Sequence, residues 1–317
     1  MAAASTLKVQ EASSSSSFQK PSKVAKAPFD DTHADVILRT SDNIDFRVFS
    51  VVLSLASPFF KTMFKLPQAE KEENPVIPMS EESAILRTVL LFCYPGAEPT
   101  FDNLDELKEV MEVMSKYDMG SVGQRVRIHL LNFLEKEPLR VFAIAACYKW
   151  EDGARKAALR LLNEPVLTLI GTQIKELEYI PAAVYQRLLD FHRRCGCAAA
   201  NLTKEPRWMD ATCIWFTCTV SACPKHDMPL TLSDGQAHWT RRWFMNYLDS
   251  ARVALEERPT KATITNSALM LPHVIKANSE CSSCRVSAAL DLTSFAHGLF
   301  SQEIDRALSK VELDLKL

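Results

Sequence analysis

The sequence predicts an α+β fold, in which a small sheet with a helical cluster is followed by a mostly α-helical C-terminal region. Two short segments with alternating apolar residues, 34–40 and 45–49, flank the polar turn 41–43, which is the pattern of a β-hairpin. From residue 52 the apolar spacing becomes helical, and it stays mainly helical beyond residue 104. The hairpin therefore belongs to a small sheet, and helices form most of the remaining chain.

Local signals predict the elements that follow the hairpin. The apolar spacing indicates a helix over residues 52–63. Two prolines suit residues 75–79 to an edge strand, because proline has no N–H to donate to a neighbouring strand. The serines and glutamates of 80–83 cap a helix that ends at Tyr94-Pro95-Gly96. Apolar residues at three- and four-residue spacing predict further helices over 104–118 and 122–134.

The C-terminal region is predicted to be helical but becomes less regular along the chain. Two helices, 138–145 and 154–162, are joined by residues 149–153. Beyond residue 164 we expect a helix opened by proline over 181–192, an aromatic-rich helix over 239–255 and a long helix over 285–313. The aromatic stripes of the 239–255 helix indicate core packing rather than a cofactor site. No repeat of 20–50 residues is evident.

Composition limits the classes of function. With 317 residues, of which 47% are hydrophobic and 24% charged, the chain can form two or three compact units. A net charge of −2 gives no general attraction for nucleic acid. The apolar runs stay well below the roughly 20 residues that span a bilayer. Nine cysteines and the lack of a secretory pattern indicate a reducing compartment, so we expect a cytoplasmic and/or nuclear protein.

The first 28 residues differ in composition from the rest of the chain. They contain a serine run at 13–17, three spaced lysines and few bulky apolar side chains. Such a segment cannot bury enough apolar surface to offset the entropy of ordering, so we expect residues 1–28 to be a disordered tail. A phosphorylation platform or a nuclear-import signal is the alternative to a plain solvated leader.

The hairpin and the helix after it carry a family resemblance. Ala34-Asp35-Val36, the Val52-Leu53 helix start, and Ser57-Pro58-Phe59-Phe60 followed by Met63-Phe64 resemble the opening of a BTB/POZ domain. The resemblance covers residues 29–135. The helical pair at 136–163 resembles a BACK-type extension, and the whole arrangement is similar to BTB proteins that are numerous in mushroom-forming fungi. Residues 164–317 form the remaining helical region.

This resemblance implies a non-enzymatic protein–protein interaction and dimerisation module of the scaffold type. Its partners would be a second copy of the chain and an unidentified protein recruited by the C-terminal region. The resemblance places the dimer interface on the first strands and helices, where core packing is the alternative role for each residue, above all for Leu53 and Phe59. The candidates are Phe29, Val36, Leu38, Leu53, Leu55, Phe59 and Phe60.

Three other partner classes stay open. The first two are weakened by departures from the family pattern, and the third by the net charge. Corepressor-binding members place a cation near the strand aspartate, but this chain has Phe49-Ser50 there, so Asp35 lacks its local cation. Adaptors of cullin-type ubiquitin ligases carry a motif in the loop that here spans residues 66–73, with no clean match. A transcription-associated or zinc-dependent nucleic-acid-binding protein is disfavoured by the net charge.

No catalytic residue is assigned. The chain has no glycine-rich phosphate loop, no Gly-x-Ser-x-Gly elbow and no His-Glu-x-x-His helix, and its paired glutamates suit solvated helix ends. Enzymatic activity and a catalytic cofactor are therefore not expected.

The cysteines suggest one structural Zn²⁺. The pairs Cys218/Cys223 and Cys281/Cys284 have spacings that suit a tetrahedral site, with His226 as a fifth candidate for four places. Small buried thiols without a metal are the alternative, since the fifty-odd residues between the pairs exceed a compact finger. Cys195 and Cys197, beside His192, are spaced too closely for a good site. Cys93 and Cys147 lie in apolar stripes and are predicted to be core residues.

Overall fold

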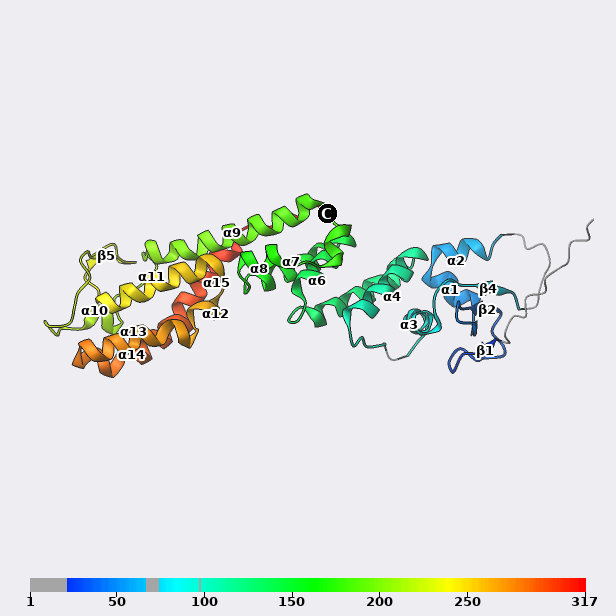
Figure 1. Cartoon of the computed structure of the whole chain (residues 1–317), viewed down its shortest axis with the longest axis horizontal. Coiled ribbons are helices and arrows are strands. Elements are labelled where there is room, and N and C mark those ends of the chain that lie inside the picture. The colour runs from blue at the N-terminus through cyan, green and yellow to red at the C-terminus, as the bar shows by residue number, and fades with distance from the viewer. Residues whose placement is uncertain (1–21, 67–73, 97) are drawn as a thin grey trace, which may run out of the picture. The chain divides into compact units, whose positions relative to one another are not determined.

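The computed structural model describes residues 22–66, 74–96 and 98–317, which divide into two compact units (Figure 1). The first unit ends at Val126, and the second runs from Arg127 to Leu317. The first contains a four-stranded sheet with helices, and the second is helical apart from one short hairpin. The predicted α+β fold class is confirmed. Within the described ranges, no helix is both long and apolar enough to cross a membrane.

The sheet is built around the predicted hairpin. Strands β2 (Val36–Arg39) and β3 (Ile44–Val48) pair antiparallel, with Val36 opposite Val48. Asn43 in the turn adopts a positive φ of 64°, a conformation that asparagine tolerates better than most residues. Strand β4 (Val76–Pro78) pairs parallel with β2 at one edge, as its prolines predicted. The strand order is β1-β3-β2-β4.

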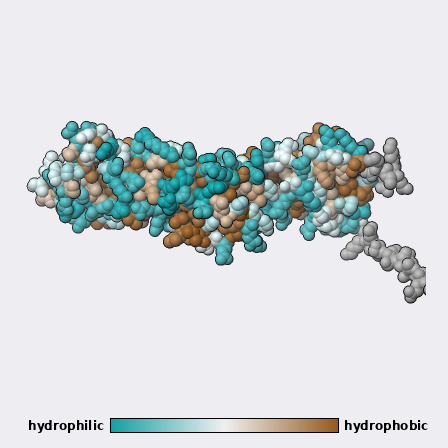
Figure 2. Space-filling view, turned by 90° about the horizontal axis from the view of Figure 1, so that it is seen from above, coloured by the Kyte–Doolittle hydropathy of each residue, from teal (hydrophilic) through white to brown (hydrophobic). Residues whose placement is uncertain are grey.

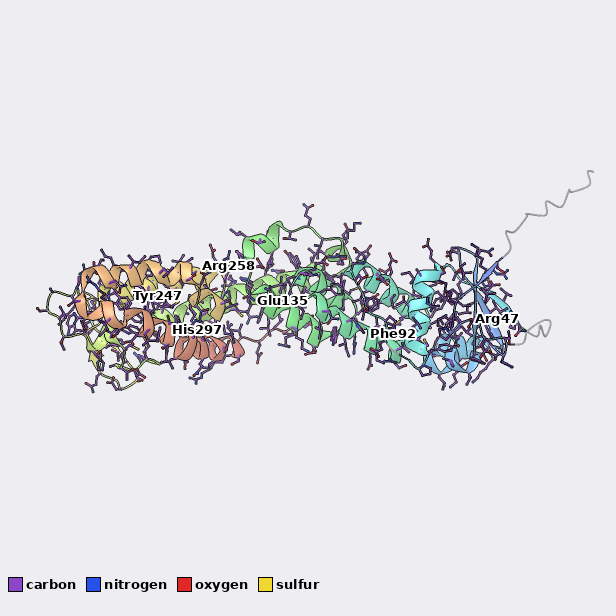
Figure 3. The ribbon with its side chains drawn as sticks, turned by 90° about the horizontal axis from the view of Figure 1, so that it is seen from below. Arg47, Phe92, Glu135, Tyr247, Arg258 and His297 are labelled. Carbon is purple, nitrogen blue, oxygen red and sulfur yellow. The ribbon has the colours of Figure 1, made fainter. Side chains whose placement is uncertain are left out.

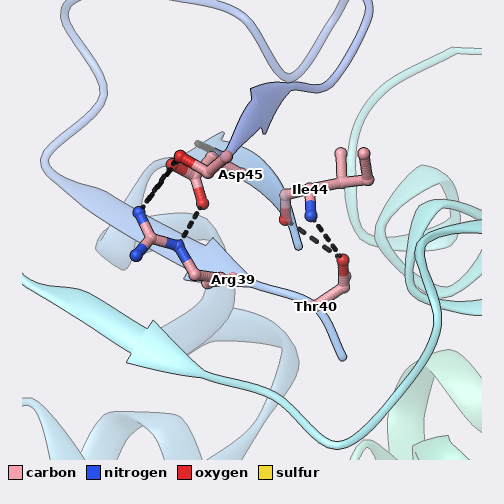
Figure 4. Close-up of polar contacts among 5 residues, drawn as sticks. Arg39, Thr40, Ile44 and Asp45 are labelled. Carbon is pink, nitrogen blue, oxygen red and sulfur yellow. Dashed lines mark hydrogen bonds and ion pairs between the residues drawn. The ribbon is translucent and has the colours of Figure 1, made fainter. Parts of the chain in front are cut away.

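Part of the segment predicted to be a disordered tail forms regular structure. Strand β1 (Lys23–Val24) pairs parallel with β3, and Ala25 is buried, although both lie in the segment expected to be a disordered tail. Asp45 explains the difference: its carboxylate accepts a hydrogen bond from Arg39 Nε at 2.7 Å (Figure 4). It also accepts one from Ser22 Oγ at 2.7 Å. The Arg39 guanidinium holds the pKa of Asp45 below its ordinary value. Residues 1–21 lie outside the described ranges.

The helix expected over residues 52–63 is two helices, α1 (Ser50–Ala56) and α2 (Pro58–Met63). Ser57 between them is extended, as the residue before a proline prefers to be. Its hydroxyl accepts a hydrogen bond from Phe60 N at 3.1 Å and donates one to Tyr117 O at 2.5 Å. Ser57 therefore caps α2 and ties it to the chain that follows α4.

The remaining helices of the first unit are α3 (Ser83–Cys93), α4 (Leu104–Lys116) and α5 (Gly120–Val126). The start of α3 is fixed by the hairpin turn, because Asp42 accepts hydrogen bonds from Ser83 N at 3.0 Å and Ser83 Oγ at 2.6 Å. Asn103 caps α4 through Glu106 N at 2.9 Å. The helix predicted over 104–118 is α4, whereas the single helix predicted over 122–134 is split: α5 ends at Val126 and a 3₁₀ helix follows it.

The second unit opens with the 3₁₀ helix η1 (Arg127–Phe133) and the paired helices α6 (Pro138–Cys147) and α7 (Glu151–Leu161). Then come α8 (Val166–Gly171), the 3₁₀ helix η2 (Lys175–Tyr179) and α9 (Ala182–Lys204). Helix α9 is about twice as long as the expected 181–192 helix. It packs along α11 (Arg242–Glu257).

The last part of the chain contains elements that the sequence pattern did not predict. These are α10 (Ile214–Thr217), the β5–β6 hairpin (Leu230–Thr231 and Ala237–His238), α12 (Lys261–Ile264) and α13 (Ser267–Glu280). The expected 285–313 helix is a continuous series of α14 (Ser282–Phe295), a π-helical turn (Ala296–Phe300) and α15 (Ser301–Ser309).

An aromatic core holds this part together. Trp215 stacks on Phe244 with ring centroids 4.1 Å apart. Tyr247 is buried and donates its hydroxyl hydrogen to Ile264 O at 3.1 Å (Figure 3). The core role predicted for the aromatic stripes holds for Trp243, Phe244 and Tyr247. Trp239 differs, because it precedes α11 and is exposed.

Candidate functional site

Four cysteine sulfurs meet in the interior of the second unit. The Sγ atoms of Cys218, Cys223, Cys281 and Cys284 all lie within 4.8 Å of one another, and all four residues are buried. Cys218 and Cys281 have sulfurs 3.7 Å apart, and those of Cys223 and Cys284 are 3.8 Å apart. Four sulfurs at about 2.3 Å from one Zn²⁺ would lie roughly 3.8 Å from each other in a tetrahedron. The cluster therefore has the size of a tetrahedral tetrathiolate site.

Two separate turns bring these sulfurs together. Cys218 ends the short helix α10, and its N–H bonds to Ile214 O at 2.9 Å. Cys281 lies between α13 and α14, where its sulfur accepts a hydrogen bond from Cys284 N at 3.5 Å and caps α14. The buried Trp215 anchors α10 against α11 through Phe244. Packing of the aromatic core thus positions both cysteine pairs.

The local environment favours thiolate at Cys281. Burial raises its pKa, but the Cys284 N–H and the neighbouring thiols outweigh that effect and lower it to about 7. For Cys284, burial raises the pKa to about 11, and the Trp243 indole opposes this rise. Burial also raises the pKa of Cys223. Metal binding would replace these protons, because a coordinated thiol is deprotonated.

The structure does not bring His226 into the cluster. This residue is half-buried, and its Nδ1 lies 2.9 Å from Met228 O and accepts a hydrogen bond from Met228 N at 3.3 Å. The hydrogen bond between His226 N and Thr240 O keeps its backbone in the turn beside the hairpin. Four cysteines, without the histidine, are therefore the candidate ligand set.

The other cysteines are scattered. Cys195 is buried in α9, whereas Cys197 on the same helix is exposed. Cys93 on α3 was predicted to be a core residue; it is half-buried, and burial raises its pKa to about 11. Cys147 is exposed at the end of α6, so its predicted core position was wrong, because the apolar stripe ends before the helix does.

The candidate dimer residues of the first unit separate into two groups. Phe29, Val36, Leu38, Leu53 and Phe60 are buried within the chain itself. Leu55 and Phe59 remain outside, with 82% and 45% of their surface exposed, and Val51 one helical turn before Leu55 is also exposed. The three residues are four positions apart in the sequence: Val51 and Leu55 lie on α1, and Phe59 lies on α2, beyond the extended Ser57. We call them the α1–α2 stripe; hydrophobic residues are visible on the surface of this unit in Figure 2.

The two positions that bear on other partners have different outcomes. Asp35 accepts hydrogen bonds from Ser50 N at 2.7 Å and from Ser50 Oγ at 2.5 Å, so a serine occupies the place where a cation was missing. Of the loop considered for a cullin contact, Leu66 is exposed, and residues 67–73 lie outside the described ranges.

A comparison with known families identifies the N-terminal domain. Residues 26–134 match the BTB/POZ domain family, which covers about a third of the chain. The N-terminal part of the chain is a BTB/POZ domain, a class of protein-interaction domain whose members commonly self-associate and bind other proteins. The match continues past Val126 into η1, which packs with the second unit. No functionally curated protein matches the chain.

Proposed function

We propose that this chain is a non-enzymatic scaffold that self-associates through its BTB domain. The observation that carries the proposal is the α1–α2 stripe, formed by Val51, Leu55 and Phe59 on a domain of this class. Isolated exposed apolar residues are ordinary, but three exposed apolar side chains on two helices that pack together are candidates for one shared contact. A two-fold contact would bury the same stripe from both copies, which is the commonest way for a soluble chain to close an assembly.

Light scattering of the full chain tests the self-association. At micromolar concentration the wild-type chain should have twice the monomer mass. The double substitution Leu55→Glu with Phe59→Glu should give the monomer, because it places two charges in the apolar contact. Val286→Glu is the matched control, since this α14 side chain is 83% exposed and lies outside the BTB domain. A monomeric wild type, or a double variant that still dimerises, would contradict the proposal.

We further propose that the four-cysteine cluster binds one structural Zn²⁺. Its support is the ligand set: four thiolates close a tetrahedron and leave no position for water or substrate. Elemental analysis of protein purified without added zinc should give about one zinc per chain. Cys281→Ser with Cys284→Ser should lose it, whereas Cys147→Ser with Cys197→Ser, at two exposed thiols, should retain it. Wild-type protein free of metal would contradict this assignment.

A further inference from the structure

A buried arginine adjoins the cysteine cluster. Arg241 immediately precedes α11 and is only 4% exposed. Its Nη1 donates a hydrogen bond to Cys223 O at 2.9 Å, and its Nη2 donates one to Cys218 O. Within the described ranges no carboxylate forms an ion pair with this guanidinium, and the nearby Asp227 pairs instead with Arg242 at 3.0 Å. A buried cation with only neutral acceptors is costly, and a negative charge close to it would lower this cost.

The cysteine cluster would supply that charge. Four thiolates around one Zn²⁺ carry a net charge of −2, which needs compensation in a buried site. Other groups around the sulfurs also carry partial positive charge, as Arg241 carries a full one. The Cys284 N–H points to Cys281 Sγ, and both residues lie at the N-terminal end of α14, which is the positive end of the helix dipole. The Trp243 indole N–H is buried near Cys284, and no nitrogen or oxygen atom of the described residues accepts a hydrogen bond from it.

The shape of the Arg241 side chain suits it to contacts with both cysteines of one pair. The two carbonyls that Arg241 contacts belong to the two cysteines of one pair, Cys218 and Cys223. A planar guanidinium can donate to both at once, whereas a lysine ammonium offers a single flexible point. The backbone of Arg241 is itself fixed, since its N–H bonds to Trp215 O at 3.1 Å and the following N–H bonds to Pro224 O at 3.0 Å.

We propose that Arg241 is the positioning residue of the metal centre: it holds the Cys218–Cys223 turn in its ligating shape and compensates the negative charge of the zinc tetrathiolate. This inference rests on the zinc site proposed above. It assigns to Arg241 a role that spacing of cysteines could not reveal, because the arginine lies outside both pairs. A purely structural role would have a different consequence: loss of the arginine would then destabilise the metal-free and the metal-loaded chain equally.

Competition with a chromophoric zinc chelator tests the inference on the full chain. Outer-shell substitutions typically weaken metal binding by about 10–100-fold, so Arg241→Met should lower zinc affinity by that factor. Arg241→Lys, which keeps the charge but loses the fork, should recover part of it. Arg242→Met is the matched control, because Arg242 is exposed and pairs with Asp227 at the surface. It should bind zinc as the wild type does.

Cobalt substitution and thermal unfolding separate the possible outcomes. The proposal expects weakened thiolate-to-cobalt absorption in Arg241→Met at limiting Co²⁺, and a smaller zinc-induced rise in melting temperature than in the wild type. Equal metal affinity in wild type and Arg241→Met would overturn the inference and leave the zinc site standing. A wild-type chain that binds neither metal would overturn both. Equal melting-temperature losses with and without zinc would also reject the role of Arg241.

Discussion

The Sγ atoms of Cys218 and Cys281 lie 3.7 Å apart, although 63 positions separate the two residues in the chain. The second pair, Cys223 and Cys284, spans 61 positions in the same way. A metal bound by all four would close a long loop that contains the β5–β6 hairpin, α11, α12 and α13. Closing such a loop restricts the unfolded chain, and metal binding adds directly to the free energy of folding.

Zinc removal is therefore expected to destabilise the second unit and leave the BTB domain intact. Chelation should lower the melting temperature of this unit by roughly 10 °C. For a unit of this size, in which about 1 kcal/mol corresponds to 2–4 °C, this is a loss of about 2.5–5 kcal/mol in the free energy of unfolding. Cys281→Ser with Cys284→Ser should reproduce the loss without chelator. Differential scanning calorimetry measures the shift, and light scattering should show the same assembly mass before and after. An unchanged transition in the double variant would show that these thiols are ordinary core residues.

A second prediction concerns the close approach of α9 and α11. A Cβ added at Gly196 would lie 2.5 Å from Glu256 O, a backbone atom that cannot move aside alone. Gly196→Ala should therefore destabilise the second unit by about 1–3 kcal/mol, the usual cost of overpacking. Gly123→Ala in α5 is the control, because a Cβ there meets nothing within 4 Å. It should be neutral or stabilising by up to about 1 kcal/mol in urea unfolding. Equal effects at both glycines would contradict the tight contact.

The sequence predicted the BTB part of the fold well because its signals are local. The hairpin has alternating residues and a polar turn, and α4 has regular apolar spacing with Asn103 as its cap. The break at Ser57 was also locally encoded, by the proline at 58, yet continuous apolar spacing concealed it. Strand β1 could not be predicted, because it depends on pairing with the distant β3 and on the contact of Ser22 with Asp45.

The metal candidates show the same limit in the second unit. Cysteine spacing alone selected all four clustered thiols, since two residues on a tight turn can share one metal. It also selected His226, whose side chain turns to its own loop. Arg241 was missed because nothing in its neighbouring sequence indicates burial. Helix α13 was missed because Pro272 lies inside it, and a proline inside a segment argues against a helix there.

A third prediction uses the buried His192. Its Nε2 lies 2.8 Å from Glu164 O, and burial lowers its pKa below the ordinary 6.5. Because the unfolded chain then binds a proton that the folded chain excludes, the contribution of His192 to stability is present above pH 6.5 and is lost as the pH falls toward the folded-state pKa. The slope is at most about 1.4 kcal/mol per pH unit for this one group.

Urea unfolding between pH 7.5 and 5 measures this slope. His192→Gln should flatten it, since glutamine can still donate to Glu164 O but does not titrate. His297→Gln is the control, because this side chain is exposed in the π-helical turn (Figure 3). Burial also lowers the pKa of His273, so some slope should persist in the His192 variant. A slope identical to that of the wild type would exclude the contribution of His192.

The last prediction concerns the anchoring of β1. Asp45 joins three segments: its side chain binds Arg39 on β2 and Ser22 before β1, and its carbonyl accepts from Ala25 N at 2.9 Å. Asp45→Asn should leave the Arg39 guanidinium with a weaker neutral acceptor. Because Arg39 is about one-third exposed, the expected loss is only about 1–2 kcal/mol, below that for a fully buried pair.

Hydrogen–deuterium exchange locates this loss in the chain. The Ala25 amide should exchange faster in Asp45→Asn than in the wild type, because β1 contributes only two residues to the sheet. Asp190→Asn is the matched control: Asp190 pairs with Arg193 and Arg194 on the exposed face of α9, where such pairs contribute at most about 1 kcal/mol. It should leave Ala25 exchange unchanged. Unchanged exchange in both variants would mean that pairing with β3, and not the Asp45 carboxylate, holds β1 in the sheet.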